Sequence, residues 1–196
     1  MTLEQPILTI AISCTVLFDM SESDRIFHEE GIESYRQHQL DHENEVLQPG
    51  VAFGLVKKLL ALNKNEHLVE VVLLSRNSAN TGLRVFNSIE HHDLDIRKAA
   101  FTSGKNPYRY IHAFGAQLFL STKKDDVESA LESGCAAGML IAQHNHDNPS
   151  ELLKIAFDGD CVLFSDEAEK INCEEGLEAF SINEKNSAKV PLKSGP

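Results

Sequence analysis

The sequence predicts an α/β protein built on a mainly parallel sheet in three layers. Short apolar segments rich in β-branched residues alternate with amphipathic segments of helical length, which is typical of parallel strands joined by crossover helices. In addition, the opening stretch of the chain is echoed about 145 residues later, which indicates a domain-sized internal repeat. We therefore expect one whole copy of an α/β unit followed by the opening of a second, incomplete copy.

Five apolar segments are interpreted as strands of the first copy. They are residues 7–18, 68–74, 96–101, 117–120 and 137–141. Helices are expected between them, because apolar residues recur there at helical spacing. The expected helices begin at residue 21, with a break at Gly31, and cover residues 51–62, 80–90, 108–113 and 123–133. A further helix is expected at 167–180.

Composition and charge exclude several classes of protein. The chain has 196 residues, of which 42% are hydrophobic, and its formal charge is −12. This acidic balance argues against nucleic acid as a partner. The apolar run 7–18 is too short to span a membrane and lacks the flanks of a signal peptide. The four cysteines show no metal-ligand spacing, so they are interpreted as reduced thiols of a cytoplasmic protein.

The stretch 155–164, IAFDGDCVLF, carries the strongest chemical signal. It is interpreted as a buried strand that ends in two carboxylates, Asp158 and Asp160, separated by Gly159. Residues i and i+2 of an extended chain point to the same side, so the two carboxylates can converge. Two like charges this close require a cation or a shared proton, and oxygen ligands suit Mg²⁺. The pattern therefore indicates phosphoryl transfer through an aspartyl-phosphate.

The pattern resembles the first motif of the haloacid-dehalogenase-like phosphatases. A wider block, FDGDCVLFSDEAEKI followed by EEGLEAF, resembles the cytosolic 5'-nucleotidase type I family. The same resemblance extends to LFDMSESDRIFHEEGIESYRQHQLDHENEVLQPG, VVLLSRNSANTGLRVFNSI and AFGAQLFLS, and so covers nearly the whole chain. It implies a Rossmann-like, haloacid-dehalogenase-like fold and the hydrolysis of a nucleoside 5'-monophosphate such as AMP or IMP.

The resemblance also implies roles for particular residues. Asp158 would be the nucleophile, and Asp160 would be the acid and base. Mg²⁺ would bind a carboxylate oxygen of Asp158 together with the backbone carbonyl of Asp160. Phosphatases of this superfamily further use a Ser or Thr at a second strand end and a Lys. In the first copy the matching positions are Ser75 and Lys105, for which a strand-end turn and a surface lysine are the alternatives.

The repeat divides the chain into a first copy at 1–142, a linker at 143–150 and the start of a second, catalytic-type copy at 151–196. Residues 29–35 match 174–180, and residues 17–18 match 163–164. Where the second copy has its two carboxylates, the first has Ser13, Cys14 and Thr15, so the first copy is interpreted as degenerate. The second copy stops before a second strand, and the chain is expected to be the N-terminal part of a longer protein.

Several alternatives stay open at this point. The chain can be a non-catalytic interaction or regulatory domain, with or without self-association into a homo-oligomer. Asp158 and Asp160 can also meet Ser75 and Lys105 in a composite site. The pairs His38 with His42 and His144 with His146 are weak hints of a metal site, for which a solvated helix and a linker are the favoured interpretations.

Overall fold

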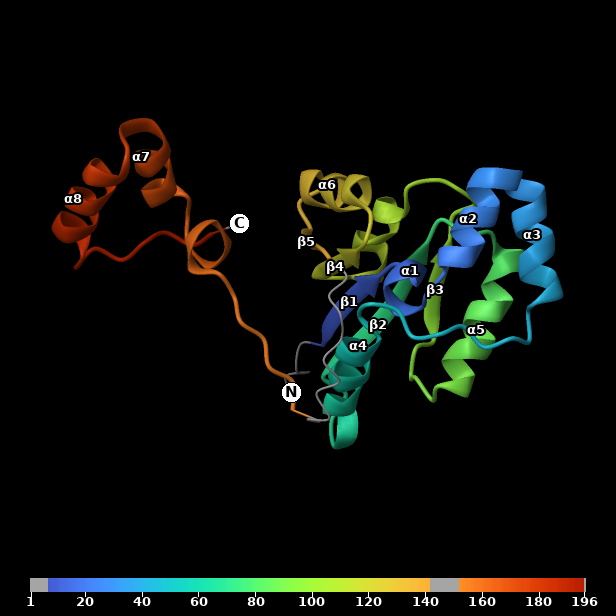
Figure 1. Ribbon diagram of the computed structural model, residues 1–196. Coiled ribbons are helices and arrows are strands. Elements are labelled where there is room, and N and C mark those ends of the chain that lie inside the picture. Colours follow the sequence, from blue (N-terminus) through green and yellow to red (C-terminus); the bar gives the residue numbers. More distant parts are fainter. Residues whose placement is uncertain (1–6, 142–151, 196) are drawn as a thin grey trace. The chain divides into compact units, whose positions relative to one another are not determined.

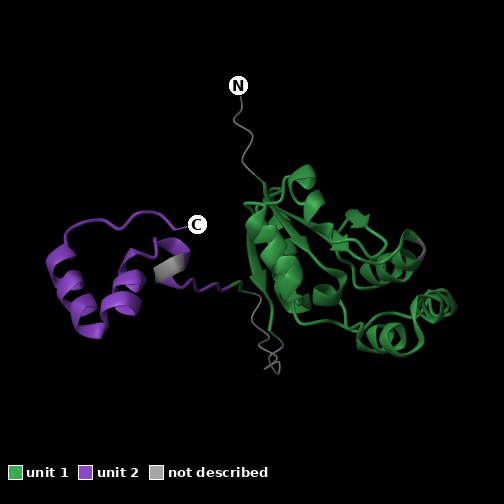
Figure 2. Ribbon diagram, turned by 90° about the horizontal axis from the view of Figure 1, so that it is seen from above, with its two compact units in different colours: residues 1–153 green, residues 154–196 purple. Residues whose placement is uncertain are grey.

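The computed structural model describes residues 7–141 and 152–195, apart from the side chains of Asn80, Asp160 and Cys161. The chain divides into two compact units, Met1–Leu153 and Lys154–Pro196 (Figure 2). The linker expected at 143–150, with His144 and His146, lies outside the described residues. In the part that the structure describes, no helix is both long enough and apolar enough to cross a membrane.

The first unit is built on a five-stranded sheet in which all strand pairs are parallel (Figure 1). The strand order is β3-β2-β1-β4-β5, so β1 is central. The strands are β1 (Leu8–Ile12), β2 (Val69–Ser75), β3 (Lys98–Phe101), β4 (Leu118–Ser121) and β5 (Ala136–Met139). The predicted α/β class with a mainly parallel sheet is confirmed.

Side chains on the two faces of the sheet belong to two separate apolar clusters. Ile10 and Ile12 of β1 pack in one cluster with Val56 of α4 (Phe53–Leu60) and Val85 of α5 (Gly82–His91). Ala11, between them, packs in the other cluster, to which α6 (Lys124–Glu132) contributes its buried alanine. Because successive side chains of a strand alternate between faces, these clusters establish the predicted helix–sheet–helix layers.

The first predicted strand is correct only in its first half. β1 ends at Ile12, and the chain then forms one helical turn, α1 (Cys14–Leu17). Val16, Leu17 and Phe18 are nevertheless fully buried, each with 0% exposure. The continuous apolar run therefore predicted the burial of these residues correctly. Hydrophobicity alone does not indicate where the strand ends and the helical turn begins.

A pair of antiparallel helices follows α1. They are α2 (Ser21–Glu30) and α3 (Ile32–Asp41), and they are separated by Gly31. Gly31 has φ 89°, a conformation that favours glycine, so the predicted break at this residue is confirmed. Its N–H donates to the carbonyl of Phe27, which closes the last turn of α2.

Short 3₁₀ segments complete the first unit. They are η1 (Ala61–Lys64), η2 (Ala79–Thr81), η3 (Pro107–Tyr110) and η4 (His112–Phe114). The last two, η3 and η4, take the place of the predicted helix 108–113.

Within residues 154–195, the regular elements of the second unit are helical, and no strand is present. A helical turn, η5 (Gly159–Leu163), precedes α7 (Glu167–Glu175) and α8 (Leu177–Ser187). The helix predicted at 167–180 is present but is divided at Gly176, which has φ 87°. The predicted buried strand at 155–164 is wrong: residues 155–158 lie outside any strand, and Phe157 is 65% exposed. A strand needs a neighbour to satisfy its backbone groups, and the described residues of this unit provide none.

A similar backbone contact occurs in each unit. In the first, Phe18 forms an antiparallel bridge with Pro49, and the Gly50 N–H donates to the Leu17 carbonyl at 2.8 Å. We call this contact, residues 17–18 with 49–50, the first clasp.

In the second unit, Phe164 bridges Ser194, and the Gly195 N–H donates to the Leu163 carbonyl at 2.9 Å. Residues 163–164 with 194–195 are the second clasp. The internal repeat itself stays a prediction.

Candidate functional site

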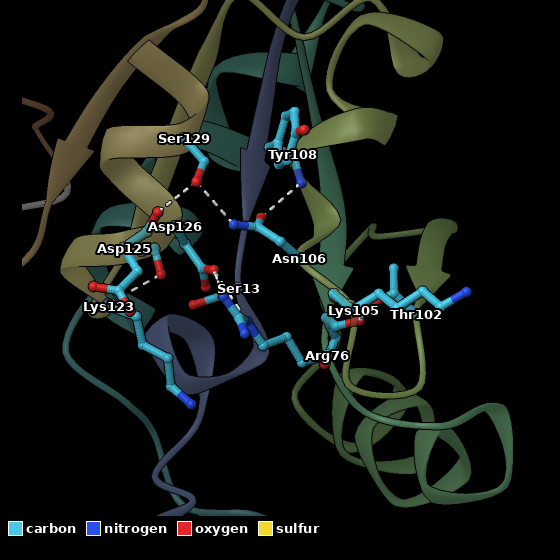
Figure 3. Close-up of polar contacts among 12 residues, drawn as sticks. Ser13, Arg76, Thr102, Lys105, Asn106, Tyr108, Lys123, Asp125, Asp126 and Ser129 are labelled. Atoms are coloured by element: carbon cyan, nitrogen blue, oxygen red, sulfur yellow. Dashed lines mark hydrogen bonds and ion pairs between the residues drawn. The ribbon is translucent and has the colours of Figure 1, made fainter. Parts of the chain in front are cut away.

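The carboxyl edge of the first sheet brings together the residues that follow β1, β2 and β4. Parallel strands end at one edge, and the strand order reverses between β1 and β4, which is where open α/β sheets place their ligands. A small cavity of about 40 Å³ lies at this edge and is lined by Ser13, Ser75, Arg76, Lys123 and Asp126, among others. Figure 3 shows the polar side chains of this region.

Hydroxyl groups occupy the end of β1. Ser13 Oγ lies 3.0 Å from Thr15 Oγ1, which lies 3.0 Å from Thr122 Oγ1 after β4. These hydroxyls can hydrogen-bond an anion, but neutral hydroxyls are poor ligands for a lone divalent cation. That the first copy is a degenerate one without carboxylates at this position stays a prediction, because it rests on the internal repeat.

An ion pair between Arg76 and Asp126 crosses the same edge. Arg76 follows β2, and its Nε donates to Oδ1 of Asp126 in α6 at 3.0 Å, while Nη2 donates to the same oxygen (Figure 3). The Asp126 side chain is only 3% exposed, whereas that of Arg76 is 36% exposed. A buried carboxylate requires such a partner, so this pair holds α6 to the end of β2.

Arg76 and Asp126 are not among the site residues predicted from the sequence. Each stands directly after or close to a predicted strand end, in SRN and STKKDD, and this position is a usable signal. The pairing could not be read from the sequence, because it depends on β2 and β4 lying on the two sides of β1.

Ser75 lies at the edge but has its own structural partners. It is 4% exposed, and its Oγ accepts a hydrogen bond from the Asn77 N–H at 3.1 Å. It also hydrogen-bonds the thiol of Cys14, whose pKa burial raises to about 11. Ser75 therefore organises the turn after β2, and its role toward phosphate stays a prediction.

Lys105 lies in the turn after β3 and is exposed. Figure 3 shows its side chain directed away from Arg76 and Asp126. Its backbone carbonyl accepts a hydrogen bond from the Thr102 hydroxyl, which stabilises the turn. The structure thus places Ser75, but not Lys105, in the lining of the edge cavity. The composite site that would join them to Asp158 and Asp160 stays a prediction.

Asp158 lies in the second unit, immediately before η5. Its backbone is extended, with φ −66° and ψ 147°, and its side chain is exposed. The backbone of Asp160 lies within η5, while its side chain is outside the described residues. Asp158 therefore stands on the amino side of a helical turn, although not at the end of a strand as predicted.

Oxygen ligands for a metal are limited in the described residues. Within 7–141 and 152–195, no group of three or more His, Cys, Asp or Glu side chains is placed to hold a metal ion. His38 and His42 lie close, with ring centroids 4.2 Å apart, but the Nδ1 of His42 faces the His38 carbonyl at 2.7 Å. Burial is the main cause that lowers the pKa of His38.

Comparisons with known proteins agree with the sequence motifs. The human cytosolic 5'-nucleotidase 1B (Homo sapiens) is 36% identical over 198 residues, which cover 96% of this chain and 32% of that protein. The chain thus spans about a third of the length of this relative.

Solved structures with a similar arrangement include the HAD domain of the effector protein Lem4 from Legionella pneumophila. It has a TM-score of 0.42 and 12% identity, and the match covers 72% of this chain and 89% of that one. An inactive mutant of the same domain has a TM-score of 0.43 and 10% identity over the same shares.

The model of the 5'-nucleotidase family matches residues 1–196, the whole chain. The match includes the Asp158-Gly159-Asp160 motif together with the first unit. The predicted family resemblance is confirmed: this chain belongs to the 5'-nucleotidase family.

Proposed function

We propose that this chain carries the nucleophile segment of a Mg²⁺-dependent cytosolic 5'-nucleotidase, which hydrolyses nucleoside 5'-monophosphates to nucleoside and phosphate. The observation that carries the proposal is the family match over residues 1–196, which includes Asp158 and Asp160. The exposed position of Asp158 before a helical turn supports it, because a nucleophile must be accessible to the phosphorus atom.

Asp158 and Asp160 have complementary roles in this proposal. A carboxylate oxygen of Asp158 attacks phosphorus, and the bond between phosphorus and the 5'-oxygen breaks. Asp160 gives a proton to that oxygen, so the nucleoside leaves as a neutral alcohol. Asp160 then removes a proton from water, which attacks the aspartyl-phosphate and releases phosphate.

The donor set fits Mg²⁺. In phosphate-transferring sites this ion is usually held by one or two carboxylates, with substrate phosphate oxygens and water in the other positions. A carboxylate oxygen of Asp158 and the backbone carbonyl of Asp160 would be the protein ligands. When bound, Mg²⁺ neutralises charge on the phosphoryl group.

The test is release of phosphate from AMP and IMP, in Mg²⁺ and in EDTA. We expect Mg²⁺-dependent release that Asp158→Asn reduces to background, because asparagine cannot form the acyl phosphate. Asp166→Asn is the matched control, since Asp166 is exposed and its ion pair among residues 7–141 and 152–195 is with the exposed Lys170. If the chain is silent, the same variants in a C-terminally extended protein decide, and silence there as well overturns the proposal.

A non-catalytic role for the first unit is a second candidate. It is favoured by the hydroxyls at the end of β1 and by the Arg76–Asp126 pair, which engages a buried acid in the lining of the same cavity. On this proposal the first unit binds or positions a ligand, while the second unit carries out the hydrolysis. A mass-resolved sizing run would show whether the chain also forms a homo-oligomer.

A further inference from the structure

We propose that the first unit contains a second, non-catalytic binding site for a phosphate monoester that carries a flat ring. The site is an open cavity of about 240 Å³ beside the carboxyl edge of the sheet. Its lining includes Arg36, Arg76, Lys123, Asn77, Phe27 and Tyr35. We call it the cationic cavity. This proposal is independent of hydrolysis by the second unit.

Three cations from different elements line the cationic cavity. Arg36 belongs to α3, Arg76 follows β2, and Lys123 precedes α6, while Asp24 is the one acid in the lining. The whole chain has a formal charge of −12, so the net positive charge of this cavity lining is opposite in sign to the net charge of the chain. Guanidinium and ammonium groups that converge on one cavity are the usual donors to phosphate.

The donors of these cations are incompletely used. Lys123 has no ion-pair partner among residues 7–141 and 152–195. Arg76 uses Nε and Nη2 for Asp126. Its Nη1 therefore remains to donate elsewhere. Arg36 pairs with Glu33, whose side chain is 80% exposed, and such surface pairs contribute little energy. A phosphate could therefore engage all three groups without breaking a buried contact.

Asn77 adds an unsatisfied donor. Its Oδ1 accepts a hydrogen bond from the Tyr35 hydroxyl at 2.8 Å, which fixes the orientation of the amide. Its Nδ2 is buried and has no acceptor in the described part of the chain. A buried donor without a partner is costly and rare, and Asn77 stands in the lining of the cationic cavity.

The remaining lining is apolar and aromatic. Phe27 and Ile32 are 44% and 49% exposed, so both side chains are accessible to a ligand in the cavity. Phe27 contacts Tyr35 edge to face, with ring centroids 5.9 Å apart. Aromatic side chains beside a cationic group favour a ligand with a planar ring next to its phosphate, as in a nucleoside monophosphate.

Turnover is not expected at the cationic cavity. Asp24 is the one carboxylate in its lining, so the lining lacks the pair of carboxylates that acts as nucleophile and as acid and base. A nucleotide held here would be sensed or retained, while one held near Asp158 would be cleaved.

The test is isothermal titration of the full chain with AMP, inorganic phosphate and adenosine, in EDTA so that hydrolysis is suppressed. We expect AMP to bind, phosphate to bind more weakly, and adenosine to bind at least tenfold more weakly than AMP. Lys123→Ala should weaken AMP binding at least tenfold. Lys57→Ala removes the same charge from an exposed position in α4, outside the cavity lining, and should leave binding unchanged.

Two further variants separate this site from the proposed catalytic segment. Phe27→Ala should weaken AMP but not inorganic phosphate, because only the ring contact is lost. Asp158→Asn should leave the Lys123-dependent binding intact. Far-UV circular dichroism checks that Lys123→Ala is folded. The proposal is overturned if AMP does not bind, or if its binding responds to Asp158→Asn and not to Lys123→Ala.

Discussion

The two clasps share their backbone contacts and differ in their surroundings. Both join an apolar dipeptide to a later glycine through one antiparallel bridge, and in both a second N–H to carbonyl bond, from Asp19 or Ser165, lies beside the glycine bond. In the first clasp Phe18 is fully buried against the sheet and α4. In the second clasp Phe164 is 42% exposed. The two clasps therefore have similar backbone hydrogen bonds but different side-chain packing.

A clasp can therefore form without a sheet beside it, whereas the burial of its aromatic side chain requires the sheet. Gly50 and Gly195 both allow a close approach of backbones, since a Cβ at either would lie within 2.8 Å of a backbone atom. The burial of the first clasp depends on β1, β2 and α4, which come from distant parts of the sequence. The second unit has no equivalent among its described residues.

The largest expected effect comes from removing the aromatic ring of each clasp. Phe18→Ala should lower the free energy of unfolding by about 3–5 kcal/mol, because the ring is buried and packs against Phe53 and His92. Phe164→Ala should cost less than about 1 kcal/mol. Urea denaturation followed by far-UV circular dichroism measures both. Equal losses would mean that the two clasps are buried alike in solution.

A smaller effect is expected from adding a methyl group at each glycine. Gly50→Ala should destabilise the first unit by about 1–3 kcal/mol, because its Cβ would lie 2.8 Å from the Phe18 nitrogen. Gly195→Ala should open only the second clasp. Hydrogen exchange at the Asp19 and Ser165 amides, which bond across the two clasps, reports each.

Gly54→Ala is the matched control for these glycines. Gly54 lies in α4, and nothing stands within 4 Å of the Cβ it would gain. Alanine there should stabilise the chain by about 0.4–1 kcal/mol, since it favours a helix. Loss of stability at Gly54 would show that the methyl group, rather than the close approach at the clasp, is the cause.

The smallest effect concerns thiol reactivity in the two units. Cys14 is buried beside the first clasp with its pKa raised to about 11, whereas Cys173 in α7 is exposed. Iodoacetamide at pH 8, read by peptide mass mapping, should modify Cys173 on the order of 100-fold faster. Comparable rates would contradict the burial of Cys14.

The same pKa predicts a pH dependence of stability. Unfolded Cys14 loses its proton near 9.0, but the folded protein keeps it to about 11. The unfolded state therefore binds fewer protons in this window, so stability should fall as the pH rises from about 9 to about 11. Cys14→Ser, which does not titrate, should remove that part of the slope.

Most of the first unit could be predicted from the sequence. The strands at 68–74 and 117–120 and the break at Gly31 followed from apolar periodicity and from glycine chemistry, both of which are local. The strand at 155–164 could not be judged in this way. An apolar run has the same pattern whether or not neighbours exist to pair with it. Gly176 repeats the local signal of Gly31, and it too divides two helices.

The candidate sites were predictable only in part. Asp158 and Asp160 are recognisable because their chemistry lies within three consecutive residues. The Arg76–Asp126 pair and the cationic cavity join residues that are tens of positions apart, on strands and helices whose neighbours depend on the strand order. Spacing along the chain carries no information about such sites.

The central place of β1 affects how the nascent chain matures on the ribosome. One edge of β1 pairs with β2. The other edge stays unpaired until β4 has been synthesised, because it pairs with β4, whose Leu118 lies opposite Ile10. At typical rates of translation that second edge stays uncovered for seconds. During this interval it offers unpaired backbone groups to other chains. Slow codons between β2 and β4 should therefore favour aggregation, while slow codons after β5 should not.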